Sequence, residues 1–286
     1  MEQLVTRLTS VDHDRGAQGL VWVYAVLSRR ARGVSVGVNL QPNNACNWHC
    51  VYCQVPGLHV GKSPPVDLAA LERELAQLLA EIESGEFYEQ HRVDGPRELR
   101  DLAFAGNGEP TASPQFAEAI DTALAARARL RQRPLPPLRV ITNGSLVALP
   151  RVEAALRKLA GAGGEAWFKL DAATDAGLAR LNRASTTAAK QMANLERCCA
   201  ALPTWIQTCV FSFDGAPPSP AELDALERAC AAAAAWPSPP RGVLLYGLAR
   251  PSLQAEAPRI ARVEEAWLRA AAQQLARSGL AIDVHP

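Results

Sequence analysis

The sequence lacks an excess of charge of either sign. Its 286 residues include 30 basic and 29 acidic side chains, which gives a formal net charge of +1. A chain so balanced has no strong non-specific attraction to nucleic acid or to an anionic membrane. Hydrophobic residues make up 48% and charged residues 21%, which is ordinary for a globular protein. Binding of a polyanion would therefore need a local basic patch, for which His91, Arg92, Arg97, Arg100 and residues 127–133 are the candidates.

The sequence also lacks a long hydrophobic run and a secretory signal. The early apolar stretch from Gly19 to Leu27 is about half the ~20 residues that span a bilayer. Glu2, Asp12 and Asp14 precede it, whereas a secretory signal begins with basic residues and ends at a small-residue cleavage site. We therefore expect a cytoplasmic protein with no membrane partner.

Cysteine is present, but in a pattern that argues against disulfide bonds. The count of seven is odd, and Cys46, Cys50 and Cys53 lie within one short segment. Such clustering favours a metal or redox role over a disulfide framework. The remaining cysteines have no cluster-like spacing, and we interpret them as buried structural thiols: Cys198, Cys199, Cys209 and Cys230.

Short β-branched runs alternate with longer alanine- and leucine-rich stretches. The expected strands are residues 34–40, 99–105, 138–142, 166–171, 205–213 and 242–248. The expected helices are residues 68–82, 114–130, 152–159, a stretch that ends near 201, 220–235 and 261–278. Strands that alternate with helices predict a parallel α/β sheet, either open and doubly wound or closed toward a barrel. Proline clusters fall between these elements, and none is long enough to link two domains.

The three clustered cysteines follow the first expected strand directly, in Asn44-Ala45-Cys46-Asn47-Trp48-His49-Cys50-Val51-Tyr52-Cys53. Parallel α/β folds gather their functional residues at this end of the strands. Thiolates suit a thiophilic metal centre, and three of them leave a coordination position open. The alternative is a structural zinc ion that takes His49 or His59 as its fourth ligand, although neither spacing matches a common zinc finger.

The Cys-x₃-Cys-x₂-Cys spacing, with an aromatic residue before the last cysteine, resembles the cluster loop of the radical S-adenosylmethionine (radical SAM) family. The resemblance implies a [4Fe–4S] cluster on Cys46, Cys50 and Cys53, with SAM bound at the fourth iron. It also implies that Tyr52 packs near the adenine of SAM.

Later strand ends carry further motifs that are similar to those of the family. Gly106-Asn107-Gly108-Glu109-Pro110 resembles its "GGE" segment, which implies that Glu109 binds the SAM amino group. Thr142-Asn143-Gly144 resembles the element that lines its SAM pocket. The strand ending in Lys169-Leu170-Asp171 resembles the one that offers polar groups near SAM. The alternative is a Lys–Asp ion pair, or two residues at the solvent-facing end of the strand. The SAM-binding candidates are therefore Tyr52, Gly106, Asn107, Glu109, Asn143, Lys169 and Asp171.

Three residues outside these motifs are weaker candidates. Arg183, in Leu181-Asn182-Arg183, could pair with a carboxylate or lie in solvent at a helix end. Tyr246 and Arg250, near the end of the sixth strand, are candidates for contact with the substrate.

The family resemblance implies a partial (βα)₆ TIM-type barrel in a single domain. We expect an N-terminal extension at residues 1–33, a radical SAM core at 34–250, and a C-terminal helix and tail at 251–286 that pack on the core. The closest likeness is to a subgroup of iron–sulfur oxidoreductases that includes relatives of the wybutosine tRNA-modifying enzyme.

The implied activity is reductive cleavage of SAM to a 5′-deoxyadenosyl radical, which abstracts hydrogen from an unidentified substrate. An RNA base and a protein or small molecule both remain open as substrates. The implied electron donor is a reductase such as flavodoxin or ferredoxin. The alternative is a non-catalytic iron–sulfur sensor or electron carrier, which would have no use for the Gly-Asn-Gly-Glu-Pro segment.

Overall fold

The computed structural model describes residues 7–9 and 19–286. Glu2, Asp12 and Asp14 therefore lie outside the described residues, as does much of the expected N-terminal extension. An eight-stranded sheet runs through the described part in the order β14-β12-β10-β9-β8-β7-β3-β2. All neighbouring strands pair in parallel except β2 and β3, which form an antiparallel hairpin. The strands are β2 (Val23–Ser28), β3 (Gly33–Val38), β7 (Leu99–Phe104), β8 (Leu138–Thr142), β9 (Glu165–Lys169), β10 (Thr204–Val210), β12 (Val243–Gly247) and β14 (Ile282–His285).

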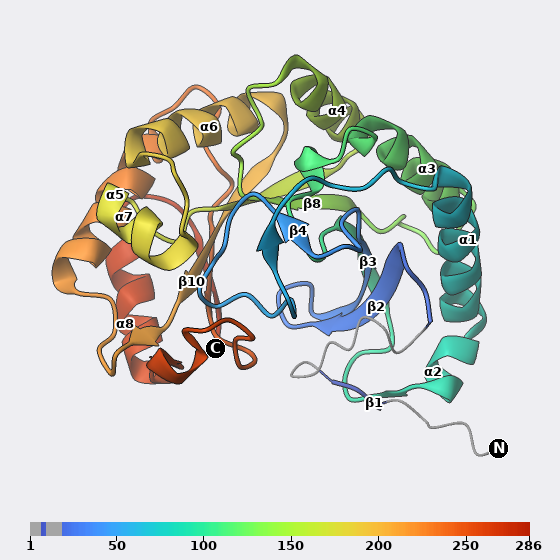
Figure 1. The fold of residues 1–286 in the computed structure, drawn as a ribbon, viewed down its shortest axis with the longest axis horizontal. Helices are drawn as coiled ribbons and strands as arrows, with labels where there is room; N and C mark the ends of the chain where they lie inside the picture. Colours follow the sequence, from blue (N-terminus) through green and yellow to red (C-terminus); the bar gives the residue numbers. More distant parts are fainter. Residues whose placement is uncertain (1–6, 10–18) are drawn as a thin grey trace.

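Helices cover the outer face of this curled sheet in an arc (Figure 1). The main ones are α1 (Leu68–Ser84), α3 (Phe116–Ala128), α4 (Pro150–Gly161), α6 (Ala188–Ala201), α7 (Pro220–Ala234) and α8 (Glu265–Ala276). Their ends carry local stop and start signals. Asp67 accepts a hydrogen bond from the Ala70 backbone at the start of α1, and Ser219 and Glu222 form a capping box on α7.

Shorter elements fill the connections. These are β1 (Arg7–Leu8), β4 (Ala45–Cys46), β5 (His59–Val60), α2 (Glu86–Gln90), β6 (Arg92–Val93), a 3₁₀ turn at Pro110–Ala112, α5 (Asp175–Gly177), a π-helical turn at Leu178–Asn182, β11 (Ser212–Phe213), a 3₁₀ turn at Ala257–Arg259 and β13 (Ile260–Ala261). Among the helices of the described residues, none has both the length and the apolar character needed to cross a bilayer.

The predicted fold class is confirmed: the mostly parallel sheet curls into a half-barrel. All six expected strands are present, but two further strands of the eight-stranded sheet were missed, β2 and β14. The apolar run that contains β2 forms the buried edge hairpin with β3. The expected start of the last helix at residue 261 was wrong, because Ile260–Ala261 pairs with Ser212–Phe213 as strand β13 and α8 begins at Glu265.

The turn between β2 and β3 brings the two edges of the sheet together. Arg32 forms an ion pair with Asp283 of β14 at 3.0 Å. Arg29 donates to the carbonyl oxygens of Pro286 and of Gly247, the latter at 3.1 Å. Side chains from one turn therefore close the side of the half-barrel that strand pairing leaves open.

Charged groups close the bottom of the barrel interior. Arg139 of β8 pairs with Asp101 of β7 and with Glu165 of β9, the latter at 2.6 Å. Arg241 adds a second contact to Glu165 at 3.3 Å. The buried carboxylates are thereby neutralised, as buried charges must be.

Candidate active site

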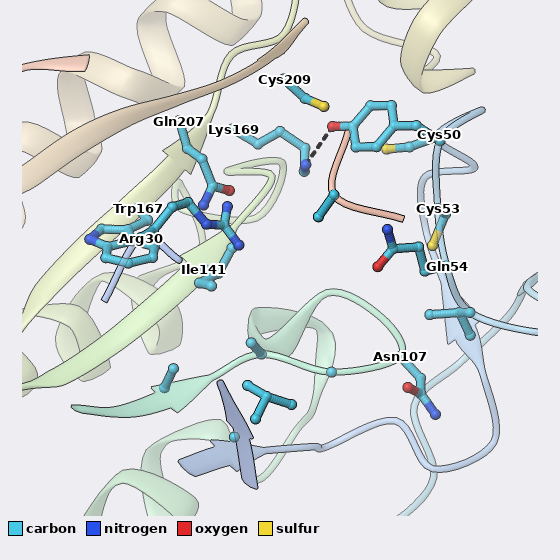
Figure 2. Close-up of a pocket in the computed structure, with 18 of the residues that line it drawn as sticks. Arg30, Cys50, Cys53, Gln54, Asn107, Ile141, Trp167, Lys169, Gln207 and Cys209 are labelled. Atoms are coloured by element: carbon cyan, nitrogen blue, oxygen red, sulfur yellow. Dashed lines mark hydrogen bonds between the residues drawn. The ribbon is translucent and has the colours of Figure 1, made fainter. Parts of the chain in front are cut away.

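A cavity of about 280 Å³ opens at the carboxyl ends of the parallel strands. Its wall includes the three clustered cysteines, inward-facing residues of β7 to β12, and the turn between β2 and β3. In Figure 2, Cys50 and Cys53 lie on one side of this cavity, and Arg30, Trp167 and Gln207 lie on the other. The structure thus brings the cysteine loop and the polar interior of the barrel to one site.

The cysteine loop is held in place from both sides by backbone hydrogen bonds. Cys46 ends the short strand β4, which pairs with β5. The amides of His49 and Val51 donate to the carbonyl oxygens of Asn182 and Leu181, and the amide of Leu253 donates to the carbonyl oxygen of Cys53. The loop is therefore anchored to the π-helical turn after β9 and to the segment after β12.

The three thiols are half-buried and line the cavity. Burial raises the pKa of Cys46 to about 11 and that of Cys50 to about 12, so both are neutral thiols at pH 7 until a metal replaces the proton. N–H groups already point at the sulfur atoms: the Trp48 amide lies 3.5 Å from the Cys46 Sγ, and the Asn182 Nδ2 lies 3.3 Å from the Cys50 Sγ. Such donors suit sulfur ligands that become thiolates on a metal cluster.

The same residues do not assemble around a single ion. Within the described part of the chain, no three His, Cys, Asp or Glu side chains are close enough to hold one metal ion. The His49 Nε2 is engaged with the Gln254 Oε1 at 3.1 Å, and His59 is exposed on β5. The arrangement therefore gives no support to the zinc alternative, which needs one of these histidines as its fourth ligand.

Glu109 lines the cavity but is only 3% exposed, and it joins the ends of β7 and β8. Its carboxylate accepts hydrogen bonds from Thr111, from the Thr142 hydroxyl at 2.7 Å, and from the Asn143 amide at 2.6 Å. Burial raises the pKa of Glu109 above its ordinary value, and these donors offset only part of that shift. Glu109 thus organises the motif residues around it, whatever else it binds.

The glycines of the same segment allow very close backbone approach. A Cβ on Gly106 would lie 2.3 Å from the Asn39 Oδ1, and one on Gly108 would lie 2.1 Å from the Ala45 carbonyl oxygen. Asn107, between them, donates from its side chain to the Asn44 Oδ1 at 2.7 Å. The segment is therefore packed directly under the cysteine loop, with no room for side chains at either glycine.

Asn143 connects the third motif to the cysteine loop. Its Nδ2 donates to the Asn47 Oδ1 at 2.8 Å, and the Asn47 side chain donates in turn to the Ser145 hydroxyl at 2.7 Å. The structure thus places the Thr-Asn-Gly element beside the segment that carries the cysteines.

Lys169, Tyr52 and Asp171 form one hydrogen-bonded chain. The Lys169 Nζ donates to the Tyr52 hydroxyl at 2.6 Å, and that hydroxyl donates to the Asp171 Oδ2. Burial is the largest influence on Lys169 and opposes its charge. Asp171 at 3.8 Å, together with Tyr246 and nearby thiols, outweighs burial and raises the pKa of the ammonium group above its usual value. Lys169 and Tyr52 line the cavity, whereas Asp171 lies behind them and also accepts from the Cys209 amide and Asn182.

The weaker candidates divide between the cavity and its rim. Tyr246 lines the cavity beside Arg30. Arg250 also lines it and donates to the Gln54 Oε1 at 2.7 Å. Arg183 forms an ion pair with the buried Glu256, so of its two predicted roles it takes the pairing with a carboxylate.

Of the four other cysteines, Cys198, Cys199 and Cys230 are buried among helices and strands, as expected for structural thiols. Cys209 is also buried, but it faces the cavity, which the sequence did not indicate. The sequence also missed Arg30, Gln207 and the Asn182 side chain as site residues. For Gln207 and Cys209 a signal was available, because alternate residues of β10 face the same side and these two are two positions apart.

Comparisons with known proteins agree with this geometry. Residues 40–216, well over half of the chain, match the family described as the radical SAM superfamily. No curated protein matches the chain at a significant level.

Several solved structures share the fold. A radical SAM methyltransferase from Sphaerobacter thermophilus aligns with a TM-score of 0.59 and 18% identity, over 88% of this chain and 65% of its own. SuiB of Streptococcus suis, solved with its precursor peptide SuiA, aligns with a TM-score of 0.55 and 10% identity, over 87% of this chain and 48% of SuiB. TYW1, solved with a lysine-pyruvate adduct, aligns with a TM-score of 0.55 and 15% identity, over 86% of this chain and 74% of TYW1. This chain thus spans about half of SuiB, and at these identities the likeness shows the fold alone.

Proposed function

This chain belongs to the radical SAM superfamily, and from that premise we propose that it is an enzyme that cleaves SAM reductively to act on a substrate held in the same cavity. Cys46, Cys50 and Cys53 would hold the [4Fe–4S] cluster. When bound, the cluster and SAM together supply a 5′-deoxyadenosyl radical that abstracts a hydrogen atom from the substrate.

One observation carries this proposal. Three half-buried thiols of a single anchored loop open onto a cavity that continues past them into the interior of the barrel. A cluster on the thiols leaves the deeper part of this cavity for SAM and for a substrate. A sensor or an electron carrier needs the cluster site but has no need for such an interior.

The chain's own residues would bind and orient SAM at the strand ends. We assign this role to Tyr52, Gly106, Asn107, Glu109, Asn143 and Lys169, which all line the cavity. Asp171, the remaining candidate, supports the proposal in another way. It fixes the Tyr52 hydroxyl and the Asn182 amide, so we assign it the role of positioning both groups. The walls of the cavity would limit the access of water and stray hydrogen donors to the reaction.

The likeness to relatives of the wybutosine tRNA-modifying enzyme supports no choice of substrate. TYW1 shares the fold at 15% identity. Two of the basic residues considered for RNA binding have acidic partners: Arg129 pairs with Glu72 and Arg100 with Glu98, both at 3.1 Å. These pairs reduce the local positive potential, which favours a protein or small-molecule substrate over RNA.

We further propose a reducing environment and a small reductase such as flavodoxin or ferredoxin as the electron donor. All seven cysteines are free thiols, which supports the prediction of a cytoplasmic location.

Anaerobic reconstitution with iron and sulfide, followed by dithionite and SAM, tests the proposal. A brown protein that releases 5′-deoxyadenosine is the expected result. A brown protein that leaves SAM intact would point to the sensor or electron carrier, and a colourless protein that retains zinc would overturn the cluster assignment.

A further inference from the structure

A second polar site lies in the cavity, on the side away from the cysteines. Four residues form it, Arg30, Trp167, Gln207 and Tyr246, and we call it the Arg30 subsite. Arg30 comes from the turn between β2 and β3, and the other three come from β9, β10 and β12. Figure 2 shows Arg30 and Gln207 beside Trp167, across the cavity from Cys50 and Cys53.

Arg30 has no carboxylate partner among the described residues. Its guanidinium carbon lies 4.5 Å from the Tyr246 ring centroid and 5.4 Å from that of Trp167. Aromatic faces stabilise the cation but accept none of its five N–H donors, which point outward in the guanidinium plane. The neighbouring Arg29 and Arg32, by contrast, are bonded to Gly247 and Asp283.

The other charged side chains of the cavity wall already have partners. Arg29 donates to Gly247 and Arg250 to Gln54, and Glu109 accepts from Thr142 and Asn143. Lys169 faces Asp171 through Tyr52, and Asp101 and Glu165 are taken by Arg139. Arg30, which has no carboxylate partner among the described residues, therefore adds positive charge to this side of the cavity.

Gln207 supplies an independent sign of a missing ligand. The residue is 1% exposed and lines the cavity, yet its Nε2 has no hydrogen-bond partner. A buried amide without a partner costs about 1–3 kcal/mol. An apolar residue of similar size would avoid that cost, so the amide is explained if a ligand oxygen accepts from it.

We propose that the Arg30 subsite binds a carboxylate group of the substrate, with Arg30 and Gln207 as donors between the Trp167 and Tyr246 rings. This inference rests on the proposed function, because it assigns the subsite to the substrate of that reaction. The two oxygens of a carboxylate match the planar fork of one guanidinium. A phosphate monoester, with about two charges and three terminal oxygens, would leave acceptors unmet by one arginine and one amide.

Ligand-observed NMR titration of the reconstituted, SAM-bound enzyme tests the subsite. The probes are acetate, succinate and benzoate, their neutral amides, and inorganic phosphate. We expect at least one carboxylate to bind saturably and its amide not to bind. Arg30→Gln should weaken that binding by about tenfold or more, as expected for loss of a charge-assisted hydrogen bond. Arg32→Gln is the matched control, because it removes the same charge from the same turn but outside the cavity, and it should change affinity by less than about twofold.

Gln207→Leu separates a binding role from a structural one. Because the Nε2 has no partner, this variant should melt at the same temperature as wild type or higher, while it loses carboxylate affinity. A lowered melting temperature with unchanged affinity would overturn the proposal. So would absence of carboxylate binding to wild type, equal binding to Arg30→Gln, or binding of phosphate in place of every carboxylate.

The 5′-deoxyadenosine assay keeps the two proposals apart. Carboxylate binding that depends on Arg30 in an enzyme that leaves SAM intact would sink the proposed function and keep the subsite as a binding site. Release of 5′-deoxyadenosine without any carboxylate binding would sink the subsite and keep the function.

Discussion

The side-chain amide of Asn182 donates a hydrogen bond to the sulfur of Cys50 at 3.3 Å. The two residues are 132 positions apart, and the backbone of the cysteine loop meets the same π-helical turn. Asn182 is fully buried and also donates to Asp171 at 2.7 Å, which fixes the direction of its amide. Residues of the second half of the barrel therefore fix a hydrogen-bond donor on the sulfur of a predicted cluster ligand.

Replacing Asn182 should change the reduction potential of the reconstituted cluster. A hydrogen bond to a ligand sulfur stabilises the more negative, reduced state. Taking ~1 kcal/mol for this bond, Asn182→Leu should lower the one-electron potential by about 40 mV. A redox titration monitored by electron paramagnetic resonance measures the shift.

Asn194→Leu provides the matched control, because Asn194 of α6 is similarly buried but, among the described residues, makes no hydrogen bond to Cys46, Cys50 or Cys53. The reduction potential of the cluster in Asn194→Leu should equal that of wild type. An unchanged potential in Asn182→Leu would show that the contact does not affect the cluster.

Each predicted cluster ligand should be indispensable for iron binding. Cys46→Ala, Cys50→Ala and Cys53→Ala should each lose most of the iron, the visible absorbance of the cluster and the cleavage of SAM, because only three thiolates are available. Iron and sulfide analysis after reconstitution is the measurement. Cys230→Ala, a buried thiol on α7, should reconstitute as wild type does. If any of the first three variants still cleaved SAM, that ligand assignment would be wrong.

The sequence predicted the parallel part of the fold well because local pattern and tertiary position agree there. Runs such as Val34 to Val38 are buried on both faces, so they read as strands without knowledge of their neighbours. Strand β14 is different: Ile282–His285 is short and half-buried, and it becomes a strand only because β12 lies beside it. Such an edge has no local signal for the sequence to carry.

The candidate site divides in the same way. Motif residues such as Cys46, Glu109 and Asn143 follow strand ends, so their convergence could be predicted from the order of strands. The Asn182 amide, Gln207 and Arg30 reach the cavity through the curl of the sheet and through a turn from its far edge. The spacing of these residues along the chain therefore does not predict that they reach the cavity.

Asp101 should make stability depend on pH in the acid range. Burial raises its pKa above the ordinary value, and Arg139 offsets only part of this. The folded state therefore binds a proton more readily than the unfolded state does, from the unfolded pKa of about 3.9 up to the raised folded value. The contribution of Asp101 to stability is highest at the acid end of that window and falls as the pH rises through it.

Asp101→Asn removes this titration. The unfolding free energy of wild type minus that of the variant should fall as the pH rises above about 4, as measured by urea unfolding at each pH. Asp121→Asn, an exposed carboxylate paired with Lys158, controls for the change in charge. A difference that grew with pH would contradict the sign assigned to Asp101.

Gly108 should be the least replaceable residue of its motif. A Cβ there would lie 2.1 Å from the Ala45 carbonyl oxygen, which is backbone of the strand that carries Cys46 and has no rotamer to move away. Gly108→Ala should therefore push the cysteine loop outward, lower the unfolding free energy by about 1–3 kcal/mol and reduce iron incorporation. Gly161→Ala is the matched control, since nothing lies within 4 Å of its added methyl group and the residue is helical. That variant should gain about 0.5–1 kcal/mol and bind iron as wild type does. Thermal unfolding and iron analysis of the two proteins together decide the matter: full iron incorporation in Gly108→Ala would mean that the loop can hold its cysteines without this contact.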